Sequence, residues 1–142
     1  MSVRRRRWAA ALLAPGLAAA AAAGCGGGPR GACSNDDGAL TQAAFVFVEA
    51  PRSGERVSSG FRVTGCSSTF EATLAWTLRA RDGRVLARGS AQGGGLEPGA
   101  FAFPVRYTLA ERQVGSLEVA APRVTREGFP PPKEVVPLVL EP

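Results

Sequence analysis

The clearest pattern along the chain is a strict alternation of apolar and polar residues that begins at residue 70. A period of two is typical of a strand with one face on a core and the other in solvent. Asp82-Gly83 follows, a pair that favours a two-residue hairpin turn, and Val85 then begins a return strand. The alternating apolar positions are Phe70, Ala72, Leu74, Trp76 and Leu78, and their polar or small partners are Glu71, Thr73, Ala75, Thr77 and Arg79.

Further short apolar runs, separated by turn residues, follow the same logic over the last hundred residues. In the segment 101–109, Pro104 lacks an amide hydrogen, which places this strand at a sheet edge or at a bulge. Strands of this length with no helical pattern among them indicate an all-β fold, and a two-sheet sandwich suits them better than a closed barrel. The seven predicted strands are 45–49, 61–66, 70–78, 85–87 with its neighbours, 101–109, 116–120 and 135–140.

Two residues on these strands have predicted orientations that matter later. Phe61 and Val63 take the core face of their strand, so Cys66 turns outward. Trp76 is predicted to lie at the centre of the core, because the residues two positions away share its face; a ligand-binding aromatic is the alternative.

The first 24 residues have the three regions of a secretory signal peptide. Arg4 to Arg7 form a basic start, the sixteen residues from Trp8 to Ala23 are apolar, and small residues precede Cys25. As a helix the apolar stretch reaches about 24 Å at about 1.5 Å per residue, which is shorter than the bilayer core of about 30 Å. Removal as a signal is therefore favoured over retention as a membrane anchor.

The run Ala22-Ala23-Gly24-Cys25 resembles the bacterial lipobox, in which the cysteine becomes the first mature residue and carries acyl chains. Ala22 stands where that motif prefers a leucine-like residue, so cleavage after Ala23 to release a soluble secreted or periplasmic protein is the alternative. Residues 25–43 are rich in Gly and small polar residues and form a predicted tether, and residues 44–142 form the predicted domain.

The chain has three cysteines. If Cys25 carries lipid, Cys33 and Cys66 remain as an even pair in an exported, oxidising setting, and we predict a disulfide between them. The alternatives are a Cys33 that stays in a mobile linker and a Cys66 that is simply a small buried residue.

Most of the net charge of +5 comes from the four arginines of the leader: from Cys25 onward, thirteen basic residues face twelve acidic ones, 13 − 12 = +1. This near balance leaves no basic stripe for nucleic acid. The absence of histidine removes histidine-dependent catalysis and imidazole metal sites. The only lysine, Lys133, stands in an exposed setting. Asn35, Asp36 and Asp37 could offer oxygen ligands to calcium, but the sequence lacks the distal glutamate and the glycine of a calcium loop. We expect no enzyme, no cofactor and no metal site.

The segment "EGFPPPKE", residues 127–134, is the predicted interaction site. Three successive prolines favour an extended, preformed conformation that a partner can recognise. A rigid crossing between the last two strands is the alternative. The candidate contact residues are Phe129, Pro130, Pro131, Pro132 and Lys133.

Several of these segments together resemble the immunoglobulin-like domain of bacterial spore germination, the Gmad type often found beside GerMN domains. The resemblance covers about residues 45–140 and depends on "PRSGERVSSGFRVTG", on Phe70-Glu71-Ala72, on the Asp82-Gly83 hairpin and on the segment from Gly99 to Phe103. It implies an immunoglobulin-like envelope module, often on lipoproteins, without catalytic residues.

These observations predict a lipoprotein held in the bacterial envelope membrane through Cys25, whose single immunoglobulin-like sandwich contacts an envelope protein or cell-wall glycan. The alternatives are a structural spacer and a small hydrolase accessory. A pocket lined by acids such as Glu71 and Glu118 would favour the hydrolase.

Overall fold

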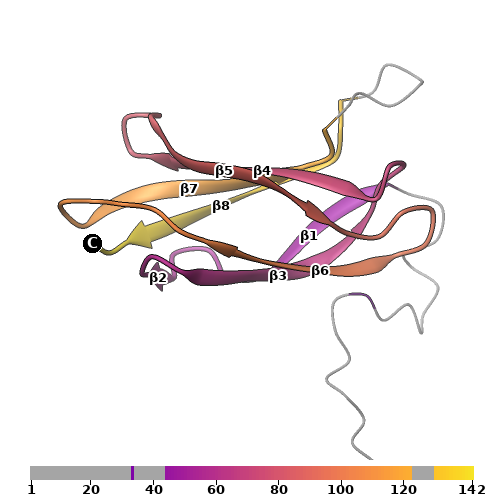
Figure 1. Ribbon diagram of the computed structural model, residues 1–142, viewed down its shortest axis with the longest axis horizontal. Helices are drawn as coiled ribbons and strands as arrows, with labels where there is room; N and C mark the ends of the chain where they lie inside the picture. The colour runs from indigo at the N-terminus through magenta and orange to yellow at the C-terminus, as the bar shows by residue number, and fades with distance from the viewer. Residues whose placement is uncertain (1–32, 34–43, 123–129) are drawn as a thin grey trace, which may run out of the picture.

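The computed structural model describes residue 33 and residues 44–122 and 130–142. These residues form two β-sheets packed face to face, with no helix among them (Figure 1). One sheet has three strands in the order β1-β3-β6, and the other has five in the order β2-β8-β7-β4-β5. The strands are β1 (Phe45–Ala50), β2 (Arg56–Val57), β3 (Phe61–Ser68), β4 (Thr73–Ala80), β5 (Val85–Gln92), β6 (Gly99–Val105), β7 (Gln113–Ala120) and β8 (Lys133–Leu140).

The predicted all-β, immunoglobulin-like sandwich is confirmed, with eight strands in place of seven. The additional strand is β2, which is two residues long and pairs in parallel with the end of β8. The chain leaves β1 through the cis peptide bond before Pro51 and then joins the other sheet as β2. One stretch of chain therefore contributes a strand to each sheet.

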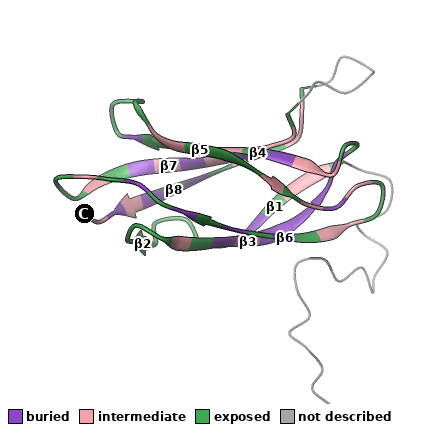
Figure 2. Ribbon diagram, in the orientation of Figure 1, coloured by how far each residue is buried: buried purple, intermediate pink, exposed green. Residues whose placement is uncertain are grey.

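The core lies between the sheets, where the alternating residues of both inner faces meet (Figure 2). The sequence predicted that Trp76 lies at the centre of the core, and this prediction is wrong. Its side chain is partly exposed and lies at the border of the core, stacked on Phe103 with ring centroids 5.2 Å apart. Leucine and valine fill the centre, namely Leu74, Leu78, Leu117, Leu138, Leu140, Val63, Val105 and Val119.

Two local predictions on β4 and its neighbours are wrong. Phe70 and Ala72 do not belong to a strand, because the Ala72 N–H donates to the Thr69 carbonyl (3.2 Å) in a turn and Ala72 has a φ of 53°. Four residues, 81–84, connect β4 to β5 in place of a two-residue turn. Among them only Gly83 has a positive φ, and its N–H donates to the Ala80 carbonyl.

The prediction for Pro104 is confirmed, because β6 is an edge strand of the three-stranded sheet. Pro104 lies opposite Arg62 of β3. The backbone N–H that proline lacks would have pointed away from β3 at the open edge, so no hydrogen bond of the sheet is lost.

Tyr107, in the chain that follows β6, contacts both β2 and the residue that follows β8. Its hydroxyl lies 2.8 Å from the Val57 carbonyl and 2.7 Å from the Glu141 carbonyl, and it can donate to either. Ser59 holds the Tyr107 backbone from the other side through its hydroxyl. Burial raises the pKa of Tyr107 above its ordinary value of 10.0. This residue therefore fixes β2 and the end of β8 against the chain that follows β6.

Candidate functional site

The predicted disulfide between Cys33 and Cys66 is present, with an S–S distance of 2.00 Å. Cys66 lies on β3 between Gly65 and Ser67 and, like Arg62, belongs to the outer face of the three-stranded sheet. It is nevertheless fully buried, so its outward direction does not make it a surface residue. The bond therefore fixes the N-terminal segment at Cys33 to the outer face of this sheet.

The proline segment is described from Pro130 onward; Phe129 lies outside the described residues. The Pro132 carbonyl accepts a hydrogen bond from the Ala121 N–H (3.0 Å), so this residue extends the ladder between β7 and β8. Lys133 begins β8, and its ammonium lies 3.3 Å from the Glu118 carboxylate. Pro130 is exposed. The interaction role of this segment stays a prediction.

Cys25, the signal peptide at 1–24 and the tether outside Cys33 also lie beyond the described residues, so lipidation stays a prediction. In the part of the chain that the structure describes, no helix is long and apolar enough to cross a membrane.

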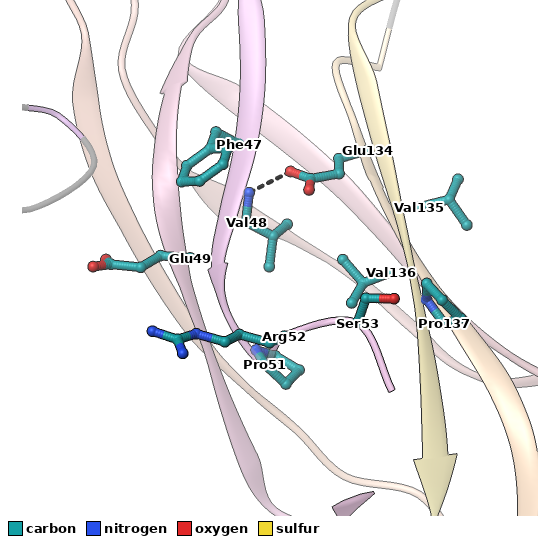
Figure 3. Close-up of a pocket in the computed structure, with 10 residues that line it drawn as sticks. All are labelled: Phe47, Val48, Glu49, Pro51, Arg52, Ser53, Glu134, Val135, Val136 and Pro137. Carbon is teal, nitrogen blue, oxygen red and sulfur yellow. Dashed lines mark hydrogen bonds between the residues drawn. The ribbon is translucent and has the colours of Figure 1, made fainter. Parts of the chain in front are cut away.

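The structure adds a site that the sequence did not indicate. A pocket of about 490 Å³ lies between β1 and β8 and extends to the chain that follows β1; it is called the edge crevice below. Its lining comes from two segments that are far apart in the sequence, within residues 47–53 and 134–137 (Figure 3). The lining residues are Phe47, Val48, Glu49, Pro51, Arg52, Ser53, Glu134, Val135, Val136 and Pro137.

The edge crevice separates two strand edges. β1 pairs with β3 on one side, and the described chain places no strand on its other side. The Val48 N–H points away from β3 and donates to the Glu134 carboxylate (Figure 3). Because backbone groups alternate in direction along a strand, the backbone of Val46 faces the same way.

The facing edge belongs to the first half of β8. β2 covers only the end of this strand, through Arg56 opposite Val139 and Val57 opposite Leu140. The Pro137 carbonyl points toward the crevice side, where it accepts a hydrogen bond from Gly54 (2.8 Å). Because backbone groups alternate in direction, the N–H and carbonyl of Val135 also point toward the crevice. Among the described residues, no strand pairs with β8 at this position.

The side chains at the edge crevice combine apolar surface with a few charges. Phe47 and Val135 are each 49% exposed. The carboxylate of Glu134 lies next to the backbone of Val48, and Glu49 and Arg52 extend on the side of β1 (Figure 3). Strand edges with apolar flanks are suited to bind an extended polypeptide, through its backbone and its alternate side chains.

The acidic residues considered from the sequence are not brought together with a metal-binding cluster in the part of the chain that the structure describes. No group of three or more His, Cys, Asp or Glu residues among them could hold a metal ion. Glu71 and Glu118, the acids considered for a hydrolase, do not line the edge crevice. Glu118 instead pairs with Lys133 on the outer face of β7 and β8.

Three comparisons with known proteins bear on these findings. The family model described as the immunoglobulin-like domain of bacterial spore germination (Gmad2) matches residues 45–123, which is more than half of the chain. No curated protein matches the sequence. Among solved structures, the crystal structure of CopC from Methylosinus trichosporium OB3b is similar at 12% identity and a TM-score of 0.44, covering 70% of this chain and 95% of that one.

Proposed function

The chain belongs to the family of immunoglobulin-like domains of bacterial spore germination, and on this premise we propose that it is an exported lipoprotein whose sandwich binds an envelope protein. The binding is non-enzymatic. The edge crevice is the binding site, and an extended segment of the partner is the ligand.

The observation that carries this proposal is the pair of strand edges that face each other across the edge crevice. An extended segment lying along it can hydrogen-bond to the backbone on the crevice side of Val46 or Val135. Its alternate side chains can pack on Phe47 and Val135, which are half exposed. A protein segment fits these groups better than a cell-wall glycan, because a glycan would need more polar side chains than the crevice provides, namely Glu49, Arg52, Ser53 and Glu134.

The location in the envelope is supported by the sequence and by the disulfide. A basic and apolar leader precedes Cys25, and a disulfide between Cys33 and Cys66 forms stably only in an oxidising compartment. Acylation at Cys25 holds the protein to the membrane in this proposal. Release of a soluble protein by cleavage after Ala23 is the second candidate for its location.

The binding site is tested with two matched substitutions in the full-length protein. Phe47→Lys places a charge at the edge crevice, and Val114→Lys places the same charge on β7, where Val114 is 55% exposed and outside the crevice. Each protein is immobilised and incubated with solubilised envelope from the native host. We expect a partner that is retained by the wild type and by Val114→Lys and is lost with Phe47→Lys.

Three other outcomes would each count against the proposal. Equal retention by both variants would place the contact outside the edge crevice. A partner that glycan-degrading enzymes remove would be cell-wall glycan and not protein. Failure of the wild type to retain any envelope component would favour a structural spacer.

A further inference from the structure

One side chain already bridges the edge crevice. The carboxylate of Glu134 reaches from β8 to β1 and accepts a hydrogen bond from the Val48 N–H (Figure 3). This N–H is one of the backbone groups that β1 offers to a ligand, because it points away from β3. Glu134 therefore occupies the place that a carbonyl of an added strand would take.

The fold directs Glu134 into the crevice. Glu134 shares the core-facing side of β8 with Val136 and Leu138, which are buried between the sheets. It lies opposite Val119 of β7, which is also buried. Its side chain therefore points inward, and an inward-pointing charge is one way in which proteins keep a strand edge from pairing with other strands.

The charges that line the edge crevice are unequal. Glu49 and Glu134 are acidic, and among the described lining residues Arg52 is the one basic residue. In the part of the chain that the structure describes, neither of the two glutamates forms an ion pair. The crevice therefore favours a ligand that brings a positive charge.

A ligand strand that pairs with β1 at Val48 must move the carboxylate of Glu134. A hydrogen bond to a carboxylate is roughly twice as strong as one to a neutral carbonyl, so the ligand backbone alone returns less than it displaces. The displaced carboxylate would lie beside the ligand and near the apolar side chains of Phe47 and Val135. A cationic side chain on the ligand makes up the difference, because charge pairs strengthen where water is excluded.

We propose that Glu134 selects extended segments that carry an arginine or a lysine. The cationic side chain pairs with the carboxylate while the ligand backbone takes over the Val48 N–H. This inference rests on the proposed function, since it names the chemistry of the segment that the edge crevice binds. Arg52 follows the end of β1 and disfavours a second cation at that end of the ligand.

Two short capped peptides of alternating threonine and valine test this selectivity. One has a central arginine, and the other has citrulline there, which keeps the shape of arginine without its charge. Each is titrated into the isotope-labelled mature chain with Cys25→Ser, which carries no lipid, and NMR follows the backbone amides of Val46, Val48 and Val135. We expect both peptides to shift these amides and the arginine peptide to bind about tenfold more tightly, as for one close charge pair of modest strength.

Three variants separate the charge of Glu134 from its hydrogen bond. Glu134→Gln keeps an oxygen that can accept from the Val48 N–H and loses the charge, so it should bind both peptides equally. Glu111→Gln makes the same change at an exposed position between β6 and β7, outside the crevice, and should keep the preference for arginine. Glu134→Ala also removes the acceptor and should bind the citrulline peptide more tightly than the wild type does.

The outcomes distinguish this inference from the proposed function. Equal affinity of the wild type for the two peptides, or a preference that persists in Glu134→Gln, would overturn the inference and leave the edge crevice supported as a peptide site. Unchanged affinity of Glu134→Ala for the citrulline peptide would contradict the closure of β1 by Glu134. If neither peptide shifts the amides at the crevice, the proposed binding site is wrong, and the inference is wrong with it.

Discussion

Substitution of Tyr107 by phenylalanine removes one hydroxyl from the junction of β2, β8 and the chain after β6. That hydroxyl has one proton to donate, and it lies 2.8 Å from the Val57 carbonyl and 2.7 Å from the Glu141 carbonyl. The Val57 carbonyl keeps a second donor, the Glu141 N–H at 2.9 Å, so only the Glu141 carbonyl loses its partner. We therefore expect a loss of about 1–2 kcal/mol in the free energy of unfolding.

The assay is urea denaturation followed by the fluorescence of Trp76, which lies at the border of the core against Phe103. Thermal unfolding should show a fall in Tm of about 4–8 °C for each kcal/mol lost. Tyr107→Leu is the matched comparison, because it also removes the edge contact of the ring with Phe61 and should cost more. A Tyr107→Phe protein as stable as the wild type would refute the role given to the hydroxyl.

Three further predictions concern the stability of the same domain. Cys33→Ser should lower the free energy of unfolding by about 3.5–4 kcal/mol, from the entropy of a loop of 33 residues, and a reductant should bring the wild type to the same urea midpoint. Gly89→Ala should cost about 1–3 kcal/mol, because its Cβ would lie 2.6 Å from the Trp76 ring, whereas Gly95→Ala meets its nearest atom at 3.5 Å and should be tolerated. The raised pKa of Tyr107 gives a stability contribution that is complete below pH 10.0 and is lost at higher pH; urea midpoints between pH 9 and 11 should fall less in Tyr107→Phe than in the wild type.

The strands that the sequence predicted best are those whose alternation faces one shared core. Phe101 and Phe103 are buried as expected, and Leu74 and Leu78 are fully buried. Pro104 identified its strand as an edge because a missing donor is tolerated only there. The disulfide followed from the count of cysteines and from the leader, without any knowledge of geometry.

The errors lie where backbone conformation overrides the pattern of side chains. Phe70 continues the alternation of β4, yet the positive φ of Ala72 ends the strand before it reaches Phe70. β2 has only two residues, too few for a period to be recognised, and it forms because the chain changes sheets after Pro51.

The edge crevice could not be predicted because it arises from the meeting of two strands at opposite ends of the chain. Phe47 and Val135 are ordinary apolar residues in ordinary strand patterns. Only the sheet order shows that, among the strands that the structure describes, none lies beside β1 or the first half of β8 on the sides that face each other. The hydrogen bond from Val48 N–H to Glu134 likewise joins residues 86 positions apart.

The central claim is that this is an exported protein that is anchored by lipid at Cys25 and has one disulfide, between Cys33 and Cys66. The most direct test is the intact mass of the mature protein, expressed with its native leader in a bacterial host, with and without reduction and thiol alkylation. The account predicts a chain that begins at Cys25 with acyl chains and takes up two alkyl groups only after reduction, at Cys33 and Cys66. An unacylated chain that begins before Cys25, or alkylation of Cys33 and Cys66 without reduction, would contradict it.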